Sequence, residues 1–256
     1  MSMKLSLFEK RILAVSVVFA IFLSLPTPAL GMHIMEGYLP IEYCVIWGVI
    51  CIPFMVMGVI RLRKLSQDNP RILILLAMSG AFIFVISSLK IPSVTGSCSH
   101  MTGTGLSAVL FGPGITSILG LIVLIFQATL LAHGGLTSLG ANAFSMAIAG
   151  PIIAWTLYRG FVMLRVNKLL AIGIAAALGD LLTYCVTSFQ LALAYPSEVG
   201  GIMASALKFL AVFAPTQVPL AIVEGILTVL IIIGMQSFAA KEFKGTSFNF
   251  QEARQS

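Results

Sequence analysis

Long apolar stretches separated by short polar ones run through most of the chain. A helix needs about 20 mostly apolar residues to cross the hydrocarbon core of a bilayer. The pattern predicts an all-α polytopic membrane protein with about seven transmembrane helices, at residues 41–62, 72–89, 101–112, 115–132, 143–158, 169–193 and 219–235. A further apolar stretch at 202–215 is short, and we expect it to lie at the interface or to re-enter the membrane.

The first 31 residues form an apolar segment of a different kind. Basic residues precede an apolar run at 12–25, prolines break that run, and small residues stand at positions 29 and 31. This layout is typical of a secretory signal peptide that is cut after Gly31. We therefore expect a cleavable signal peptide at 1–31, a transmembrane metal-binding domain at 32–237 and a cytoplasmic tail at 238–256.

Composition and charge narrow the class of protein further. The chain is 59% hydrophobic and 9% charged, whereas a soluble domain carries roughly 25% charged residues. The net charge of +6 comes largely from short basic loops and does not indicate nucleic-acid binding. Basic loops mark the cytoplasmic side of a membrane. Those that follow residues 62, 158 and 235 predict a multi-pass protein of the cell (inner) membrane, with its mature N-terminus outside and its C-terminus in the cytoplasm.

Cleavage after Gly31 would create a chelating N-terminus. The new α-amine of Met32, the amide nitrogen of His33 and the imidazole of His33 can wrap one metal ion in fused chelate rings. The amine and the imidazole have unperturbed pKa values of about 7.7–8.0 and 6.5, so both can lose their protons near neutral pH. The alternative is that His33 is an ordinary polar residue after a cleavage site.

A second histidine lies in the polar, glycine-rich connector at residues 90–105. On the predicted topology His100 is on the same outer side as His33 and could supply a fourth nitrogen. Four nitrogens in a plane suit Ni²⁺ or Cu²⁺, with Co²⁺ also possible. The alternative is that the His100 ring bonds to loop carbonyls and binds no ion. All three histidines of the chain lie on the outer side, which favours a shared site.

Three other residues are candidates for supporting this site. His133, in the second glycine-rich loop at 133–142, is a direct ligand, a supporting residue, or a cation at the C-terminal end of a helix. Asn142 either orients a ligand or caps the next helix. Cys98, two residues before His100, is either a soft ligand or a packing residue.

Other polar residues leave several function classes open. Asp180 and Glu224 lie within predicted spans, where a carboxylate marks either a functional site or a hydrogen-bonded link between helices. The sequence contains no Walker, HExxH or GxSxG motif, so this chain has no P-loop with which to hydrolyse ATP. The remaining classes are a metal-capture subunit, an intramembrane metalloenzyme and a secondary transporter that uses the two carboxylates.

Several segments together resemble the CbiM family, namely MHIMEGYLP at 32–40, KIPSVTGSCSH at 90–100, LFGPG at 110–114, AHGGLT at 132–137 and LGANAFSMA at 139–147. CbiM proteins are the substrate-capturing S components of energy-coupling-factor (ECF) cobalt transporters, and NikM proteins are their nickel relatives. The resemblance implies a transporter subunit that is not an enzyme, and Co(II), or Ni(II), as the transported substrate. It also implies Met32, His33 and His100 as ligands. Met35 and Glu36 are similar to the cobalt branch, because nickel relatives tend to carry Pro-Asp there.

The same resemblance implies an assembly and a pathway. The partners would be a CbiN-like small membrane subunit, a CbiQ-like coupling subunit and a CbiO-like ATPase, and the cobalt would serve cobalamin biosynthesis. The fold would be that of an ECF S component, in which the N-terminus and the glycine-rich outer loops form the metal site. Many relatives begin at the methionine itself, whereas the site expected here depends on cleavage.

Overall fold

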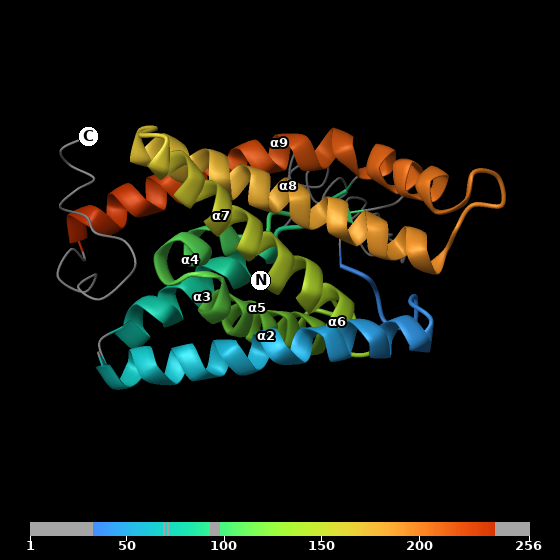
Figure 1. Cartoon of the computed structure of the whole chain (residues 1–256), viewed down its shortest axis with the longest axis horizontal. Helices are drawn as coiled ribbons and strands as arrows, with labels where there is room; N and C mark the ends of the chain where they lie inside the picture. The colour runs from blue at the N-terminus through green and yellow to red at the C-terminus, as the bar shows by residue number, and fades with distance from the viewer. Residues whose placement is uncertain (1–32, 69, 71, 93–97, 239–256) are drawn as a thin grey trace, which may run out of the picture.

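The computed structural model describes residues 33–68, 70, 72–92 and 98–238, and within these ranges it is almost entirely helical (Figure 1). The predicted signal peptide and all but the first residue of the predicted tail lie outside the described residues. The elements follow in the order α2 (Ile41–Asp68), α3 (Ile72–Ser88), β1 (Ile91–Pro92), β2 (Cys98–Ser99), α4 (Thr104–Phe111), α5 (Pro113–Leu130), α6 (Leu139–Asn142), the π-helix η2 (Ala143–Ala149), α7 (Gly150–Met163), α8 (Lys168–Ala194) and α9 (Gly201–Phe238).

The helices confirm a polytopic all-α membrane protein. In the described part of the chain, five helices are long and apolar enough to cross a membrane: Ile41–Asp68, Pro113–Leu130, Leu139–Met163, Lys168–Ala194 and Gly201–Met235. Helix α3 is a shorter apolar helix, and α4 is a buried helix of 8 residues. Together these helices follow the order of the predicted spans.

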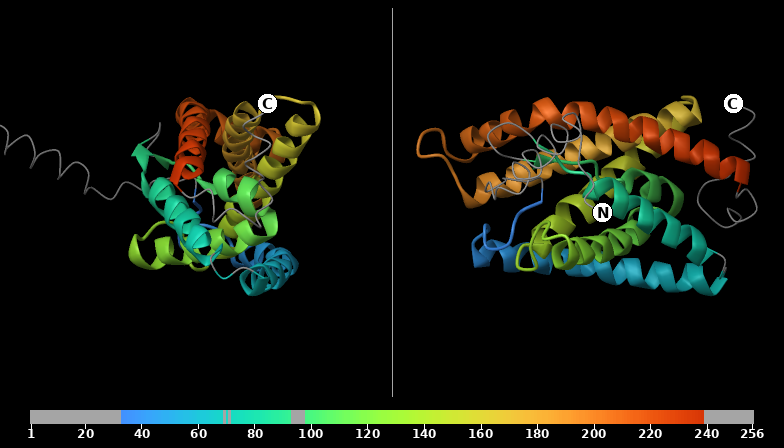
Figure 2. Two further views of the ribbon diagram at one scale, coloured as in Figure 1. Left: turned by 90° about the vertical axis from the view of Figure 1, so that its left-hand side faces the viewer. Right: turned by 180° about the vertical axis from the view of Figure 1, so that it is seen from behind.

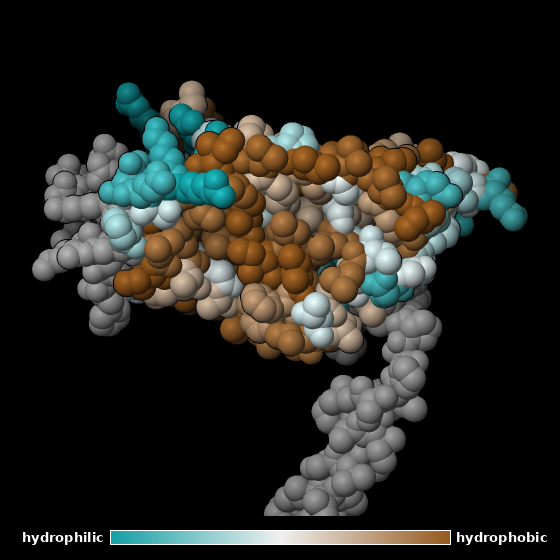
Figure 3. Space-filling view, turned by 90° about the horizontal axis from the view of Figure 1, so that it is seen from below, coloured by the Kyte–Doolittle hydropathy of each residue, from teal (hydrophilic) through white to brown (hydrophobic). Residues whose placement is uncertain are grey.

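The outer surface of the helices is largely apolar, as is expected for a surface in contact with lipid. Figure 3 shows a broad hydrophobic band along the long axis, with hydrophilic residues gathered toward both ends. On α2 the side chains of Val45, Val49 and Val56 are more than half exposed. A soluble protein rarely exposes a continuous apolar surface of this size, so the band is the face that lipid covers.

The helices run between two ends of the molecule. One end holds the start of α2, the loop after α5 and the turn between α8 and α9 (Figures 1 and 2). The opposite end holds the connection between α2 and α3, the turn between α7 and α8, and the end of α9. We call these the histidine end and the basic end, because the loop after α5, which carries His133, lies at the first, and Arg63 and Arg165 lie in or next to the connections at the second.

The segment from Ser99 to the start of α4 lies in the interior of the bundle. Ile91 pairs with Ser99 across a short antiparallel ladder, and all side chains from residue 99 to residue 112 are buried. Helix α4 begins after Gly103, whose φ of 68° is accessible to glycine, and a Cβ there would lie 3.1 Å from the Cα of Ile83. Irregular backbone at membrane depth is tolerated only where protein or a cavity surrounds it, and here protein does.

Two expectations from the sequence are wrong in detail. Residues 202–215 form neither an interfacial nor a re-entrant segment, because α9 continues through Pro215 and Pro219 as one helix of 38 residues. Membrane helices tolerate proline where neighbouring groups satisfy the freed backbone carbonyls. Asn142 does not cap a helix, since the helix begins at Leu139 and Asn142 is the last residue of α6, next to the π-helix.

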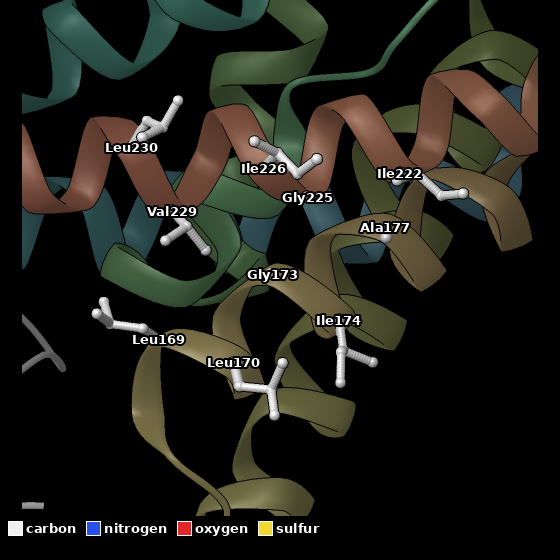
Figure 4. A pocket seen from close by; sticks show the side chains of 10 residues that line it. All are labelled: Leu169, Leu170, Gly173, Ile174, Ala177, Ile222, Gly225, Ile226, Val229 and Leu230. Carbon is white, nitrogen blue, oxygen red and sulfur yellow. The ribbon is translucent and has the colours of Figure 1, made fainter.

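An apolar groove lies between α8 and α9, where the two helices approach closely. A Cβ on Gly225 would lie 2.6 Å from the carbonyl oxygen of Gly173, so only glycine permits this contact. Figure 4 shows aliphatic side chains such as Leu170, Ile174 and Ile226 around the groove. None of its lining residues is polar or belongs to the histidine loops, which makes the groove unsuitable for a hydrophilic cation.

Candidate metal centre

Three histidines from distant parts of the chain meet in the interior. His33 precedes α2, His100 follows β2 and His133 lies beyond the end of α5. Their side chains are 2%, 0% and 1% exposed. One nitrogen from each ring lies within 4.8 Å of the others, which groups them as a possible metal site. We call these three residues the histidine cluster.

His33 and His100 face each other through specific nitrogens. The Nδ1 atom of His33 lies 2.5 Å from the Nε2 atom of His100. The Nδ1 atom of His100 lies 2.8 Å from the carbonyl oxygen of Met101, to which it can only donate. This contact assigns the proton of His100 to Nδ1 and leaves a lone pair on Nε2, directed at His33.

His133 completes the cluster from the opposite side. Its ring centroid lies 4.4 Å from that of His33 and 5.0 Å from that of His100. Among the residues that the structure describes, the Nε2 atoms of His33 and His133 are buried and have no hydrogen-bond partner. Buried polar atoms normally find a partner, so these two nitrogens are open to a ligand from outside the chain.

Burial keeps the imidazoles uncharged. Loss of hydration lowers the pKa of His100 to about 4 and that of His133 to about 2. Loss of hydration, and then repulsion from His133 and His100, lowers the pKa of His33 well below its usual value. This shift favours a neutral His133 over a cation at the end of a helix. Neutral imidazole is also the form that binds metals.

Asn142 and Ser138 fix the backbone next to His33. Asn142 Oδ1 accepts a hydrogen bond from the amide nitrogen of Ile34 at 2.8 Å, and Asn142 Nδ2 donates to the Ile34 carbonyl at 3.0 Å. Ser138 Oγ donates to the same carbonyl at 2.5 Å. Asn142 therefore fixes the backbone of Ile34, the residue that follows His33. The π-helix that begins at the next residue is a feature often found at functional sites.

The loop between α5 and α6 packs directly on the N-terminal segment. A Cβ on Gly135 would lie 2.5 Å from the Cα of Glu36, so glycine is required for this approach. The Glu36 carboxylate accepts a hydrogen bond from the amide of Thr137 at 3.2 Å, and hydrogen bonds from Thr137 hold the pKa of Glu36 below its usual value. The two glycine-rich loops therefore hold the cluster from two sides, the connector through His100 and this loop through His133.

Some candidate site residues from the sequence cannot be placed relative to the histidine cluster. Met32 lies outside the described residues, and so does the side chain of Cys98, whose backbone pairs with Pro92. Two contacts were missed by the sequence analysis, those of Ser138 to Ile34 and of Gln217 to the carbonyl of His100, at 3.2 Å. The only signal for Gln217 was a lone amide between two prolines in an apolar run.

The two carboxylates within the spans contact the same loop. Asp180 Oδ1 and Glu224 Oε2 both accept from the amide nitrogen of Thr102, at 3.1 and 2.6 Å. Both carboxylates thus link helices α8 and α9 to the segment that carries His100, which is the structural interpretation offered for them from the sequence.

These features define a polytopic helical membrane protein with a buried nitrogen-rich site of the kind that binds a metal cation. The family model described as "Cobalt uptake substrate-specific transmembrane region", CbiM, matches residues 33–242. The chain belongs to the CbiM family. This membership makes it a component of a cobalt transport system and not an enzyme, so the alternative of an intramembrane metalloenzyme is set aside.

Close relatives and a solved structure agree with this assignment. The chain is 64% identical over 234 residues to a cobalt transport protein CbiM from Lachnoclostridium phytofermentans, covering 91% of this chain and 94% of that one. It is 60% identical over 225 residues to the CbiM protein from Chlorobium limicola, covering 88% of each. A crystal structure of a truncated transition metal transporter superimposes with a TM-score of 0.70 at 27% identity, covering 80% of this chain and 98% of that one.

Proposed function

We propose that this protein is the substrate-capture subunit of an ATP-driven ECF cobalt importer, which binds Co(II) at its processed N-terminus and delivers it for cobalamin biosynthesis. The observation that carries this proposal is the pairing of His33 Nδ1 with His100 Nε2 at 2.5 Å. An ion that bonds two adjacent nitrogens at about 2.0 Å holds them about 2.8 Å apart. The two nitrogens therefore already have nearly the spacing of neighbouring ligands.

The particular nitrogen of His33 supports the chelate. An N-terminal chelate that includes the amine of Met32 and the amide of His33 closes onto Nδ1 of the imidazole, since Nε2 is too far along the ring. Nδ1 is the atom that faces His100. Amine, amide, Nδ1 of His33 and Nε2 of His100 would then make a planar set of four nitrogens, with His133 beside that plane.

Processing of the N-terminus can be tested directly. N-terminal sequencing of the purified protein should read Met-His-Ile, and a one-residue alanine insertion between Met32 and His33 should abolish tight binding because it enlarges a chelate ring. A protein that retains residues 1–31 and still binds cobalt with full affinity would contradict the role proposed for the processed N-terminus.

The orientation in the membrane is inferred from the basic residues. The need for partner subunits is inferred from the missing nucleotide-binding motif. The basic end of the molecule faces the cytoplasm under the positive-inside rule, which exposes the histidine end outside. The chain has no phosphate-binding loop, so ATP hydrolysis belongs to a separate CbiO-like subunit, coupled through CbiQ-like and CbiN-like membrane subunits.

Nickel is the second candidate substrate, because a planar set of nitrogens suits Ni²⁺ as well as Co²⁺. The deciding experiment measures the metal content of the processed protein after Co(II) and Ni(II) are supplied separately and then together. Preferential retention of cobalt supports the proposal. Retention of nickel alone would assign the protein to the nickel branch of the family. Retention of neither metal would contradict the proposed metal site.

A further inference from the structure

A set of polar side chains lies beside the histidine cluster, in the interior of the bundle. Asp180 on α8 and Gln217 and Glu224 on α9 are all almost completely buried. None of the three has a recorded bond to an imidazole ring, yet all three bond to the segment from His100 to Thr102. Charged and amide groups are rarely buried in a membrane protein, because their burial costs free energy. The fact that all three bond to the same segment therefore calls for an explanation.

Gln217 links the backbone of His100 to the neighbouring helix. Its Nε2 atom donates to the carbonyl oxygen of His100 at 3.2 Å and to Asp180 Oδ2 at 2.7 Å. One side chain of α9 therefore joins α8 to the residue that directs a nitrogen at His33. The bond to a carboxylate is the stronger kind, and it fixes the amide orientation because both partners of Nε2 are acceptors.

Glu224 holds the other end of the same segment. Its carboxylate accepts from the Thr102 amide at 2.6 Å and from the Thr102 hydroxyl at 3.0 and 3.2 Å, and the amides of Gly103 and Gly105 face it as well. These amides belong to the unpaired donors at the start of α4, where the capping residue Gly103 has no side chain. The oxygens of Glu224 therefore cap α4 from a different helix, in place of the side chain that an N-cap residue usually supplies.

We propose that Gln217 and Glu224 are positioning residues for the metal site, and that they convert a displacement between α9 and α4 into a change of metal affinity. This inference rests on the proposed function. The two side chains hold His100 and Thr102 on either side of Met101, whose carbonyl orients the His100 ring. Metal ligands depend on such surrounding hydrogen bonds for their orientation.

The arrangement gives the bundle a physical route for releasing the ion. Every bond between α9 and this segment runs through a buried polar atom that has no water to replace its partner. A shift of α9 along α4 would break these bonds together, and His100 would lose its fixed direction. Affinity would then fall without any change in the ligands themselves.

The test compares three substitutions on α9 in the full, processed protein in detergent. Gln217→Met removes the amide at nearly constant volume, and Glu224→Gln keeps the shape but turns donor hydrogens toward the amides of α4. Thr228→Val is the matched control, because Thr228 is one turn from Glu224, is buried and has an unpartnered hydroxyl. The readouts are the equilibrium affinity for Co(II) and the visible absorption of the bound ion, which reports ligand geometry.

We expect Gln217→Met and Glu224→Gln each to weaken Co(II) binding by about 10–100-fold and to shift the absorption bands, as for other hydrogen-bond partners of metal ligands. Thr228→Val should leave both readouts unchanged. If Gln217→Met fails to fold, Glu224→Gln decides alone. Normal affinity with unshifted absorption in the folded variants would overturn this inference, whereas a lack of Co(II) binding by the unsubstituted protein would overturn the proposed function instead.

Discussion

At the scale of single residues, the neutrality of the imidazoles follows from where the chain places them. His33, His100 and His133 come from loops that are polar in sequence, yet each ring is removed from water. An uncharged imidazole retains a lone pair, and the Nδ1 proton of His100 is fixed by the Met101 carbonyl. With the proton of His100 on Nδ1, the contact between the two rings has His33 Nδ1 donating to His100 Nε2, and the ion would take the place of that one proton.

The first prediction concerns the ligands. His33→Ala and His100→Ala should each abolish high-affinity Co(II) binding, because each removes a nitrogen from the proposed planar set. His133→Ala should weaken binding less, since that set is complete without it. Equilibrium binding to the solubilised variants measures the effect, with insertion and folding checked by gel filtration. Near-normal affinity of His100→Ala would remove His100 from the ligands.

The second prediction concerns the stability of the metal-free protein against pH. The pKa of His100 is about 4 in the folded chain and about 6.5 when unfolded, so the unfolded state binds more protons between these values. Stability from this source is complete above about pH 6.5 and falls as the pH drops toward the folded value. Thermal unfolding across this range should show the decline, and His133→Gln should reduce its slope. A flat profile would show that the rings are hydrated.

At the scale of elements, the fit between two loops and the N-terminal segment builds the site. The α5–α6 loop contacts residues 33–37 through a glycine approach and hydrogen bonds, and the connector before α4 brings His100 in from the interior. In their described residues, the α5–α6 loop has no helix or strand, and the connector has only the two-residue strands β1 and β2. Their positions depend on the helices that flank them and on Asn142, which bonds to Ile34.

The third prediction tests this packing. Gly135→Ala should weaken Co(II) binding and lower the melting temperature, because its Cβ would lie 2.5 Å from the Cα of Glu36 and the backbone must move. Gly160→Ala is the control, because a Cβ there meets nothing within 4 Å and alanine favours the helix. Equal affinities of the two variants would show that the α5–α6 loop does not position His33.

Much of the arrangement of helices and loops could be predicted from the hydrophobic pattern and the motifs, but some of the contacts could not. Apolar runs of spanning length located the main helices, and the grouping of the histidines on one side favoured a shared site. The apolar stretch at 202–215 was expected to be separate from the span at 219–235, whereas the structure joins the two in one helix, because packing within the bundle overrides local preference. The contact of Gln217 with His100 spans 117 positions in sequence, and a single sequence does not encode such pairings in any local pattern.

At the scale of the whole molecule, the polar groups are gathered at the two ends. Apolar side chains cover the middle, and the basic connections gather at the end opposite the two histidine loops (Figures 2 and 3). His100 reaches the cluster from the interior, so the ion would be held inside the bundle and not on its surface. Under the proposed function, release of the bound ion would require movement of elements, and the partner ATPase would drive that movement.

The fourth prediction concerns the source of energy for cobalt uptake. Cells should accumulate cobalt only when this chain is expressed together with its ATPase and coupling subunits, because the chain has no nucleotide-binding loop of its own. A metal-uptake assay with and without the partners measures the difference, with an ATPase-inactive partner as control. Sustained accumulation by this chain alone, as fast as with the full assembly, would favour the secondary transporter that the sequence left open.

The separation of the three histidines along the chain has a consequence for biogenesis. Positions 33, 100 and 133 belong to segments that become neighbours only after α2, α3, α4 and α5 have all inserted and docked. A chain that stalls partway holds isolated imidazoles, each a weak ligand by itself. Under the proposed function, tight cobalt retention would therefore report finished assembly, and a misassembled molecule would neither retain the ion nor compete for it with mature copies.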